Sequence, residues 1–142
     1  MTSGLAQLSL SVAGSKAGLA KVFESFEEFS SAHGIPDAVR RPMQVALDEL
    51  LSNTVRCGKV GDRDLVIEVG FRLDPEDLRV EVADDGTPFN PLARESPDTT
   101  LPLEQRPVGG LGVMLVKHLV DEIAYDREGG RNHVLLRKRL RA

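Results

Sequence analysis

Residues 65–82 read LVIEVGFRLDPEDLRVEV, and their pattern predicts two strands joined by a tight turn. Hydrophobic residues alternate with other residues over 65–73 and again over 78–82. A period of two is typical of strands that are buried on one face only. The sequence Asp-Pro-Glu-Asp lies between the two runs at 74–77, and Asp and Pro are both favoured in tight turns. This stretch therefore predicts a β-hairpin.

The residues before this hairpin predict one further strand and two helices. Residues 8–12 alternate in the same way as the hairpin strands. From Ser15 onward, apolar residues recur at helical spacing as far as the Gly-Ile-Pro sequence at 34–36, which is expected to end the helix. A second helix with one apolar face is expected from about Pro36 or Asp37 to Cys57.

The residues after the hairpin begin with a long irregular stretch. Residues 84–107 contain five of the eight prolines and few apolar residues. Loops of this length are uncommon in compact domains and are often functional, so a lid is expected over about 87–108. The remaining expected elements follow the glycines at 109–112: a helix to about Glu122, a strand over 123–126, a turn at 128–131 and a strand over 133–140.

The order of these elements predicts the fold class. Short turns join neighbouring strands, so the sheet should be mostly antiparallel, with the helices packed on one face. This arrangement is an α+β two-layer sandwich. A chain of 142 residues with 41% hydrophobic residues fits one domain, and residues 1–142 are expected to form it.

The bulk properties of the chain narrow its function class and its compartment. A net charge of −4 argues against nucleic-acid binding, which requires clustered positive charge. We interpret the basic residues Arg137, Lys138, Arg139 and Arg141 as the solvated side of an edge strand. Cys57 is the single cysteine, which suits a reducing compartment. The sequence has neither a signal-peptide pattern nor a long apolar run, so a soluble cytoplasmic protein is expected.

The first polar motif lies on the second expected helix. Glu49 and Asn53 are four residues apart, so they share one face of the helix, close to its apolar side. A carboxylate and an amide turned toward a sheet need polar partners, because unpaired burial is costly. The pair alone is also compatible with a solvated helix flank.

Two further motifs flank the long loop. Asp84-Asp85-Gly86-Thr87-Pro88 follows a strand, where a carboxylate can accept a hydrogen bond from an exocyclic amine such as that of adenine. Gly109-Gly110-Leu111-Gly112 opens a helix, where backbone N–H groups and the helix dipole favour a phosphate. Taken singly, these motifs are also compatible with an ordinary turn and a flexible helix junction. Neither a P-loop nor the dinucleotide-binding fingerprint is present in the sequence.

The order of the three motifs resembles the gyrase, chaperone, histidine-kinase and mismatch-repair ATPase superfamily (GHKL, the Bergerat fold), over about residues 5–140. Within it the chain looks most like the anti-sigma-factor serine/threonine kinases. Two positions depart from the family pattern: Cys57 stands where a histidine is frequent, and Pro88 where a second glycine is expected. The matching segments are ALDELLSN (46–53), VADDGTPFNP (82–91), GGLGVMLVKHLVDEIAY (109–125) and GGRNHVLLRK (129–138).

The resemblance implies a role for each motif. Glu49 would be the general base toward the acceptor hydroxyl, Asn53 the Mg²⁺ ligand, and Asp84 the acceptor for the adenine amine. Arg106 would reach the γ-phosphate, although a solvated loop arginine is an alternative. The other implied nucleotide contacts are Gly86 and Thr87 near the adenine, and Gly110, Leu111 and Gly112 at the phosphates.

The function implied by the resemblance is an ATP- and Mg²⁺-dependent protein kinase. It would phosphorylate a Ser or Thr of a small antagonist (anti-anti-sigma) protein and regulate a sigma factor, and thereby transcription, by partner switching. A homodimer is implied, with no direct contact to nucleic acid or membrane. Two alternatives stay open: a nucleotide-binding switch module without catalysis, and a regulatory domain that is normally fused to a phosphatase or receiver domain.

Overall fold

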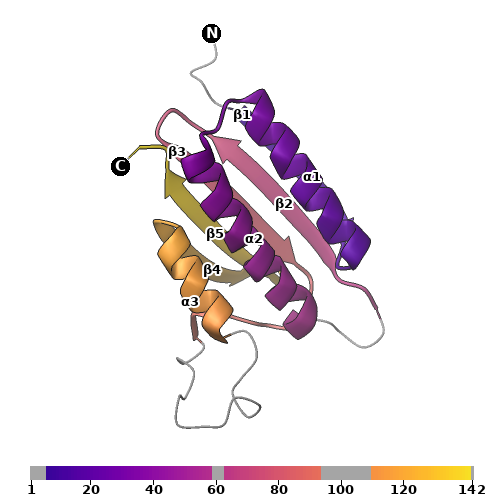
Figure 1. The fold of residues 1–142 in the computed structure, drawn as a ribbon. Coiled ribbons are helices and arrows are strands. Elements are labelled where there is room, and N and C mark those ends of the chain that lie inside the picture. The colour runs from indigo at the N-terminus through magenta and orange to yellow at the C-terminus, as the bar shows by residue number, and fades with distance from the viewer. Residues whose placement is uncertain (1–5, 59–62, 94–109, 142) are drawn as a thin grey trace.

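The computed structural model describes residues 6–58, 63–93 and 110–141. Within these residues a five-stranded sheet carries α-helices on one face, as expected for an α+β two-layer sandwich (Figure 1). No helix in this part of the chain has the length and apolar character needed to cross a bilayer. The elements are β1 (Ala6–Ala13), α1 (Lys16–Ala32), α2 (Asp37–Gly58), β2 (Val66–Leu73), β3 (Asp77–Asp84), the short 3₁₀ helix η1 (Pro91–Ala93), α3 (Gly110–Leu119), β4 (Glu122–Glu128) and β5 (Arg131–Arg139).

The hairpin predicted from residues 65–82 is confirmed as β2 and β3. The two strands pair antiparallel, and Phe71 lies opposite Val80. In the turn, Asp74 Oδ1 accepts hydrogen bonds from the backbone N–H groups of Glu76 at 2.8 Å and Asp77 at 2.7 Å. The side chain of the first turn residue therefore supplies the acceptor that these two N–H groups would otherwise lack.

The strand order is β1-β2-β3-β5-β4, and every neighbouring pair is antiparallel. The interpretation of the C-terminal basic run as part of an edge strand is therefore wrong, because β5 lies between β3 and β4. Arg137 on β5 forms ion pairs with Asp77 of β3 at 3.4 Å and with Glu122 of β4 at 3.1 Å. Neighbouring strands on both sides thus supply the carboxylates that neutralise this arginine.

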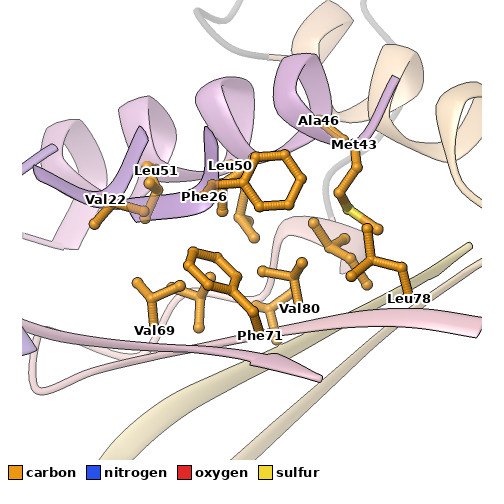
Figure 2. Packing of buried hydrophobic residues seen from close by; sticks show 14 of the residues in the cluster. Val22, Phe26, Met43, Ala46, Leu50, Leu51, Val69, Phe71, Leu78 and Val80 are labelled. Atoms are coloured by element: carbon orange, nitrogen blue, oxygen red, sulfur yellow. The ribbon is translucent and has the colours of Figure 1, made fainter. Parts of the chain in front are cut away.

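The core lies between the sheet and the helices α1 and α2 (Figure 2). Phe71 of β2 contacts Phe26 and Phe29 of α1, with ring centroids 5.2 and 5.7 Å apart. The apolar face predicted for the second helix is buried, and Met43 and Leu47 of α2 are fully enclosed. Aliphatic residues fill most of the remaining core, as expected for a chain with few aromatic residues.

The boundaries of α3 differ from those predicted. The helix begins at Gly110, so the glycine motif forms its first turn instead of preceding it. It ends at Leu119, three residues earlier than predicted, because the next residues pair with β5. The N–H of Asp121 donates to the carbonyl of Arg137 at 2.8 Å, and the Asp121 carboxylate accepts from the N–H of Arg139 at 2.6 Å.

Candidate functional site

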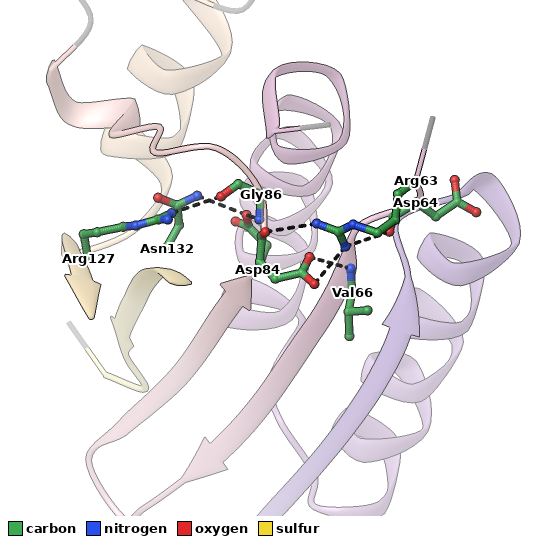
Figure 3. A network of polar contacts seen from close by, with 8 residues as sticks. Arg63, Asp64, Val66, Asp84, Gly86, Arg127 and Asn132 are labelled. Carbon is green, nitrogen blue, oxygen red and sulfur yellow. Dashed lines mark hydrogen bonds and ion pairs between the residues drawn. The ribbon is translucent and has the colours of Figure 1, made fainter. Parts of the chain in front are cut away.

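The candidate site is built where β3 ends, beside the C-terminal half of α2. Asp84 is the last residue of β3 and is only 6% exposed. Its Oδ1 atom accepts hydrogen bonds from the backbone N–H of Gly86 at 2.9 Å and from Asn132 Nδ2 at 3.0 Å. The turn after β3 therefore folds back on the carboxylate that ends the strand (Figure 3).

Asn132 of β5 connects this turn to two other strands. It is 2% exposed and lies directly opposite Asp84 in the β3–β5 pairing. Its Nδ2 also donates to the carbonyl of Thr87 at 2.9 Å, and its Oδ1 accepts from the N–H of Phe89 at 3.1 Å and from Tyr125 Oη at 2.6 Å. The sequence reasoning assigned Asn132 no role. A signal was available in the sequence, because Asn132 alternates with Val134 and Leu136 and so shares the buried face of β5 with them. A polar side chain on a buried face needs hydrogen-bond partners.

Neighbouring strands hold the two sides of the same turn (Figure 3). On one side Arg127 of β4 donates to the carbonyl of Gly86 at 3.1 Å. On the other side Asp85 accepts from the N–H of Val66 and from Arg63, both at 2.9 Å. These donors hold the pKa of the Asp85 carboxyl below its ordinary value of 3.8, with the Val66 N–H as the larger cause. The backbone around Gly86 is therefore fixed from both flanks.

The α2 motif presents a half-buried carboxylate and a fully buried amide. Glu49 is partly exposed and its neighbour Asp48 is exposed, whereas Asn53 is only 1% exposed. Asn53 Oδ1 accepts a hydrogen bond from Arg56 Nη2 on the next helical turn. Among the described residues, Asn53 Nδ2 has no hydrogen-bond partner. A buried amide left in this state is costly, so Asn53 is a candidate for binding a group from outside these residues.

The glycine motif lies at the start of α3, which packs against α2. Gly110, Leu111 and Gly112 belong to the first helical turn, where backbone N–H groups have no intrahelical acceptor. Figure 1 shows this end of α3 and the C-terminal half of α2 at the same end of the molecule. Arg106 and residues 94–108 of the lid predicted over about 87–108 lie outside the described residues. Thr87 is described and lies on the exposed side of the turn after Gly86.

The residues that the structure describes contain no group of three His, Cys, Asp or Glu side chains suited to hold a metal ion. Mg²⁺ commonly binds through one or two protein oxygens together with phosphate and water. A single ligand such as Asn53 is therefore compatible with a metal that arrives with a phosphate-bearing molecule.

Comparisons with known proteins identify the family to which the fold belongs. The family described as histidine kinase-like ATPase domain matches residues 12–138. The chain is 26% identical over 98 residues to the serine/threonine-protein kinase BtrW of Bordetella bronchiseptica, covering 69% of each protein. It is 28% identical over 123 residues to the serine-protein kinase RsbW of Listeria monocytogenes, covering 84% of this chain and 68% of that protein.

Two solved structures show the same fold. The structure of the RsbU and RsbW domains of a Mycobacterium tuberculosis protein superposes with a TM-score of 0.66 and 17% identity. It covers 94% of this chain, which spans 32% of that longer chain. The histidine kinase AdeS of Acinetobacter baumannii superposes with a TM-score of 0.51 and 15% identity, over 95% of this chain and 68% of that one.

Proposed function

This chain belongs to the histidine kinase-like ATPase domain family, and from that premise we propose that it is an ATP-dependent protein serine/threonine kinase of the anti-sigma-factor type. The observation that carries the proposal is the Asp84 turn. A buried carboxylate ends a strand, and donors from three other strands bind this carboxylate, the carboxylate of Asp85 and the carbonyl of Gly86. Such a fixed acceptor suits recognition of the exocyclic amine of adenine. The kinase-named relatives BtrW and RsbW support the assignment of ATP as the nucleotide.

Mg²⁺ would be held through the side-chain oxygen of Asn53, which is the kind of ligand that Mg²⁺ takes from proteins. Asn53 is buried, and its Nδ2, which has no partner among the described residues, is a donor and would face an acceptor and not the metal. Its Oδ1 accepts from Arg56, so the guanidinium would have to move aside for the metal. When bound, Mg²⁺ neutralises the charge of the phosphates during phosphoryl transfer.

The phosphates would lie against the start of α3, whose first turn offers the N–H groups of Gly110, Leu111 and Gly112. Arg106, before this turn in the sequence, would reach the γ-phosphate. Thr87 and Gly86 would line the adenine. These assignments follow from the family resemblance together with the position of each residue in the chain.

Glu49 is the proposed general base. It lies one helical turn before Asn53 on α2, so the base and the metal ligand share a face. Glu49 would accept the proton of the acceptor hydroxyl while that oxygen bonds to the γ-phosphorus and ADP leaves. General-base catalysis of this kind contributes about 10²–10⁴-fold to the rate.

The proposed acceptor is a Ser or Thr of a small anti-anti-sigma protein, and the regulated partner is a sigma factor. Partner switching between them would control transcription without direct contact to nucleic acid. We also propose that the protein is a cytoplasmic homodimer, because the family resemblance implies a dimer.

The test is transfer of labelled γ-phosphate from ATP to a candidate antagonist protein in the presence of Mg²⁺. Glu49→Gln should slow labelling by about 100-fold or more while ATP affinity, measured by calorimetry, is retained. Asp48→Asn is the matched control, because it removes the adjacent exposed carboxylate of α2. Equal labelling by the wild type and Glu49→Gln would remove Glu49 as the base.

A second candidate function is a nucleotide-binding partner switch that transfers no phosphate. One observation favours it: Arg56 donates to the Asn53 oxygen that the metal would need. In the same assay this function predicts ATP binding by the wild type without labelling of any antagonist.

A further inference from the structure

We propose that Asn132 is a positioning residue of the nucleotide site, which orients the Asp84 carboxylate and thereby sets the preference for a 6-aminopurine. This inference rests on the proposed function, in which Asp84 accepts a hydrogen bond from adenine. Asn132 lies opposite Asp84 in the sheet and donates to Asp84 Oδ1 at 3.0 Å. The buried amide of Asn132 thus contacts the carboxylate that is proposed to bind adenine.

The hydrogen bonds of Asn132 define which way its amide faces. Its Nδ2 donates to two acceptors, Asp84 Oδ1 and the carbonyl of Thr87. Its Oδ1 accepts from two donors, the N–H of Phe89 and the hydroxyl of Tyr125. Rotating the amide by 180° would set its NH2 against the N–H of Phe89 and its oxygen against two acceptors, whereas the Tyr125 hydroxyl can serve either orientation. All four bonding positions are matched in one orientation, which makes asparagine specific here.

This arrangement couples the carboxylate to the chain that follows it. The Gly86 N–H and Asn132 Nδ2 share Asp84 Oδ1, so the plane of the carboxylate is fixed by β5 and by its own turn. The same amide holds the backbone at Thr87 and Phe89. Asn132 is 2% exposed, and hydrogen bonds in such surroundings are stronger than in water. Loss of the amide would therefore release the acceptor and the adjoining turn together.

The informative variant is Asn132→Asp, which keeps the shape of the side chain. It removes both Nδ2 donors and sets a second carboxylate against Asp84. ATP affinity should fall by about tenfold or more, the size expected for a hydrogen bond to a charged group. The decisive quantity is selectivity, the ratio of the dissociation constants of purine riboside triphosphate, which lacks the 6-amino group, and ATP. This ratio should fall toward one.

Two further variants separate positioning from stability. Val134→Ala removes a buried core side chain two residues along the same face of β5. It should lower the melting temperature of the free protein and leave the selectivity ratio unchanged. Tyr125→Phe removes only one donor to Asn132 Oδ1, so the ratio should fall in the same direction by a smaller factor, about threefold.

The experiment is calorimetric titration of each folded variant with ATP and with purine riboside triphosphate. A collapsed ratio in Asn132→Asp with an unchanged ratio in Val134→Ala supports the proposal. A preserved ratio in Asn132→Asp overturns it while adenine recognition by the wild type stands. If Asn132→Asp does not fold, an unchanged ratio in Tyr125→Phe overturns it instead. A wild type that binds both nucleotides equally removes the adenine contact and this inference with it. Failure of phosphate transfer alone leaves it intact.

Discussion

A carboxylate that recognises adenine must keep an acceptor atom in a fixed direction, and Asp84 meets this requirement through its burial and its two donors. Asp84→Asn replaces one acceptor oxygen by a donor and removes the charge. We expect ATP to bind more weakly by about 1–3 kcal/mol, the size of a buried hydrogen bond to a charged group. Calorimetric titration with ATP measures the change, with Asp126→Asn on the exposed edge of β4 as the control. Unchanged affinity would show that adenine binds elsewhere.

At the scale of single residues, the sequence supports a prediction when the relevant neighbours are close in the chain. Glu49 and Asn53 share a helical face, and helix geometry alone predicts it. Asn132 is different, because its partner Asp84 is 48 positions away and the register of β3 against β5 sets the contact. Arg56 was missed although it stands three residues after Asn53, a spacing at which helical side chains are neighbours.

The β2–β3 hairpin depends on the ionised side chain of its first turn residue. The N–H groups of Asp77 and Glu76 hold the pKa of the Asp74 carboxyl below its ordinary value of 3.8. A carboxyl with a lowered folded-state pKa stabilises the fold above its unfolded-state pKa, and this stabilisation is lost as the pH falls through the folded-state value. Asp74→Asn should therefore be less stable than the wild type at pH 7, with a difference that shrinks as the pH falls below 3.8 and through the lower folded-state pKa.

Urea unfolding followed by circular dichroism at a series of pH values tests this prediction. Glu76→Gln is the control, because Glu76 contributes its backbone N–H to the turn and keeps it in the variant. If the two variants lose stability with the same pH dependence, the Asp74 side chain is not the acid-sensitive part of the hairpin.

At the scale of elements, the sequence predicted each strand and α-helix of the described part but not the short helix η1. Its other errors concern where elements end and which strands are neighbours. Hydrophobic period defines the middle of an element, whereas hydrogen bonds from another element define where α3 ends, as Asp121 does by pairing with β5. Hydrogen bonds with other elements also define the position of β5 between β3 and β4. The sequence alone suggested an edge strand because the two carboxylates that form ion pairs with Arg137, Asp77 and Glu122, come from strands far apart in sequence.

At the scale of the whole molecule, the described residues share one hydrophobic core, and Phe71 lies within it. Phe71 is 1% exposed and contacts both Phe26 and Phe29 across the two layers. Phe71→Ala should reduce the free energy of unfolding by about 3–5 kcal/mol, a large share of the roughly 5–15 kcal/mol typical of a domain.

Leu8 provides a matched control for this substitution, because it lies directly opposite Phe71 in the β1–β2 pairing but is 39% exposed. Leu8→Ala should change the free energy of unfolding by about 0.5 kcal/mol or less. Urea unfolding of both variants at neutral pH gives the comparison. The sequence pattern predicts that both residues lie on the apolar face of their strands. Only the strand order shows that Leu8 belongs to β1, at the edge of the sheet. Equal losses would mean that the helices cover β1 as fully as β2, and that the core extends to the edge of the sheet.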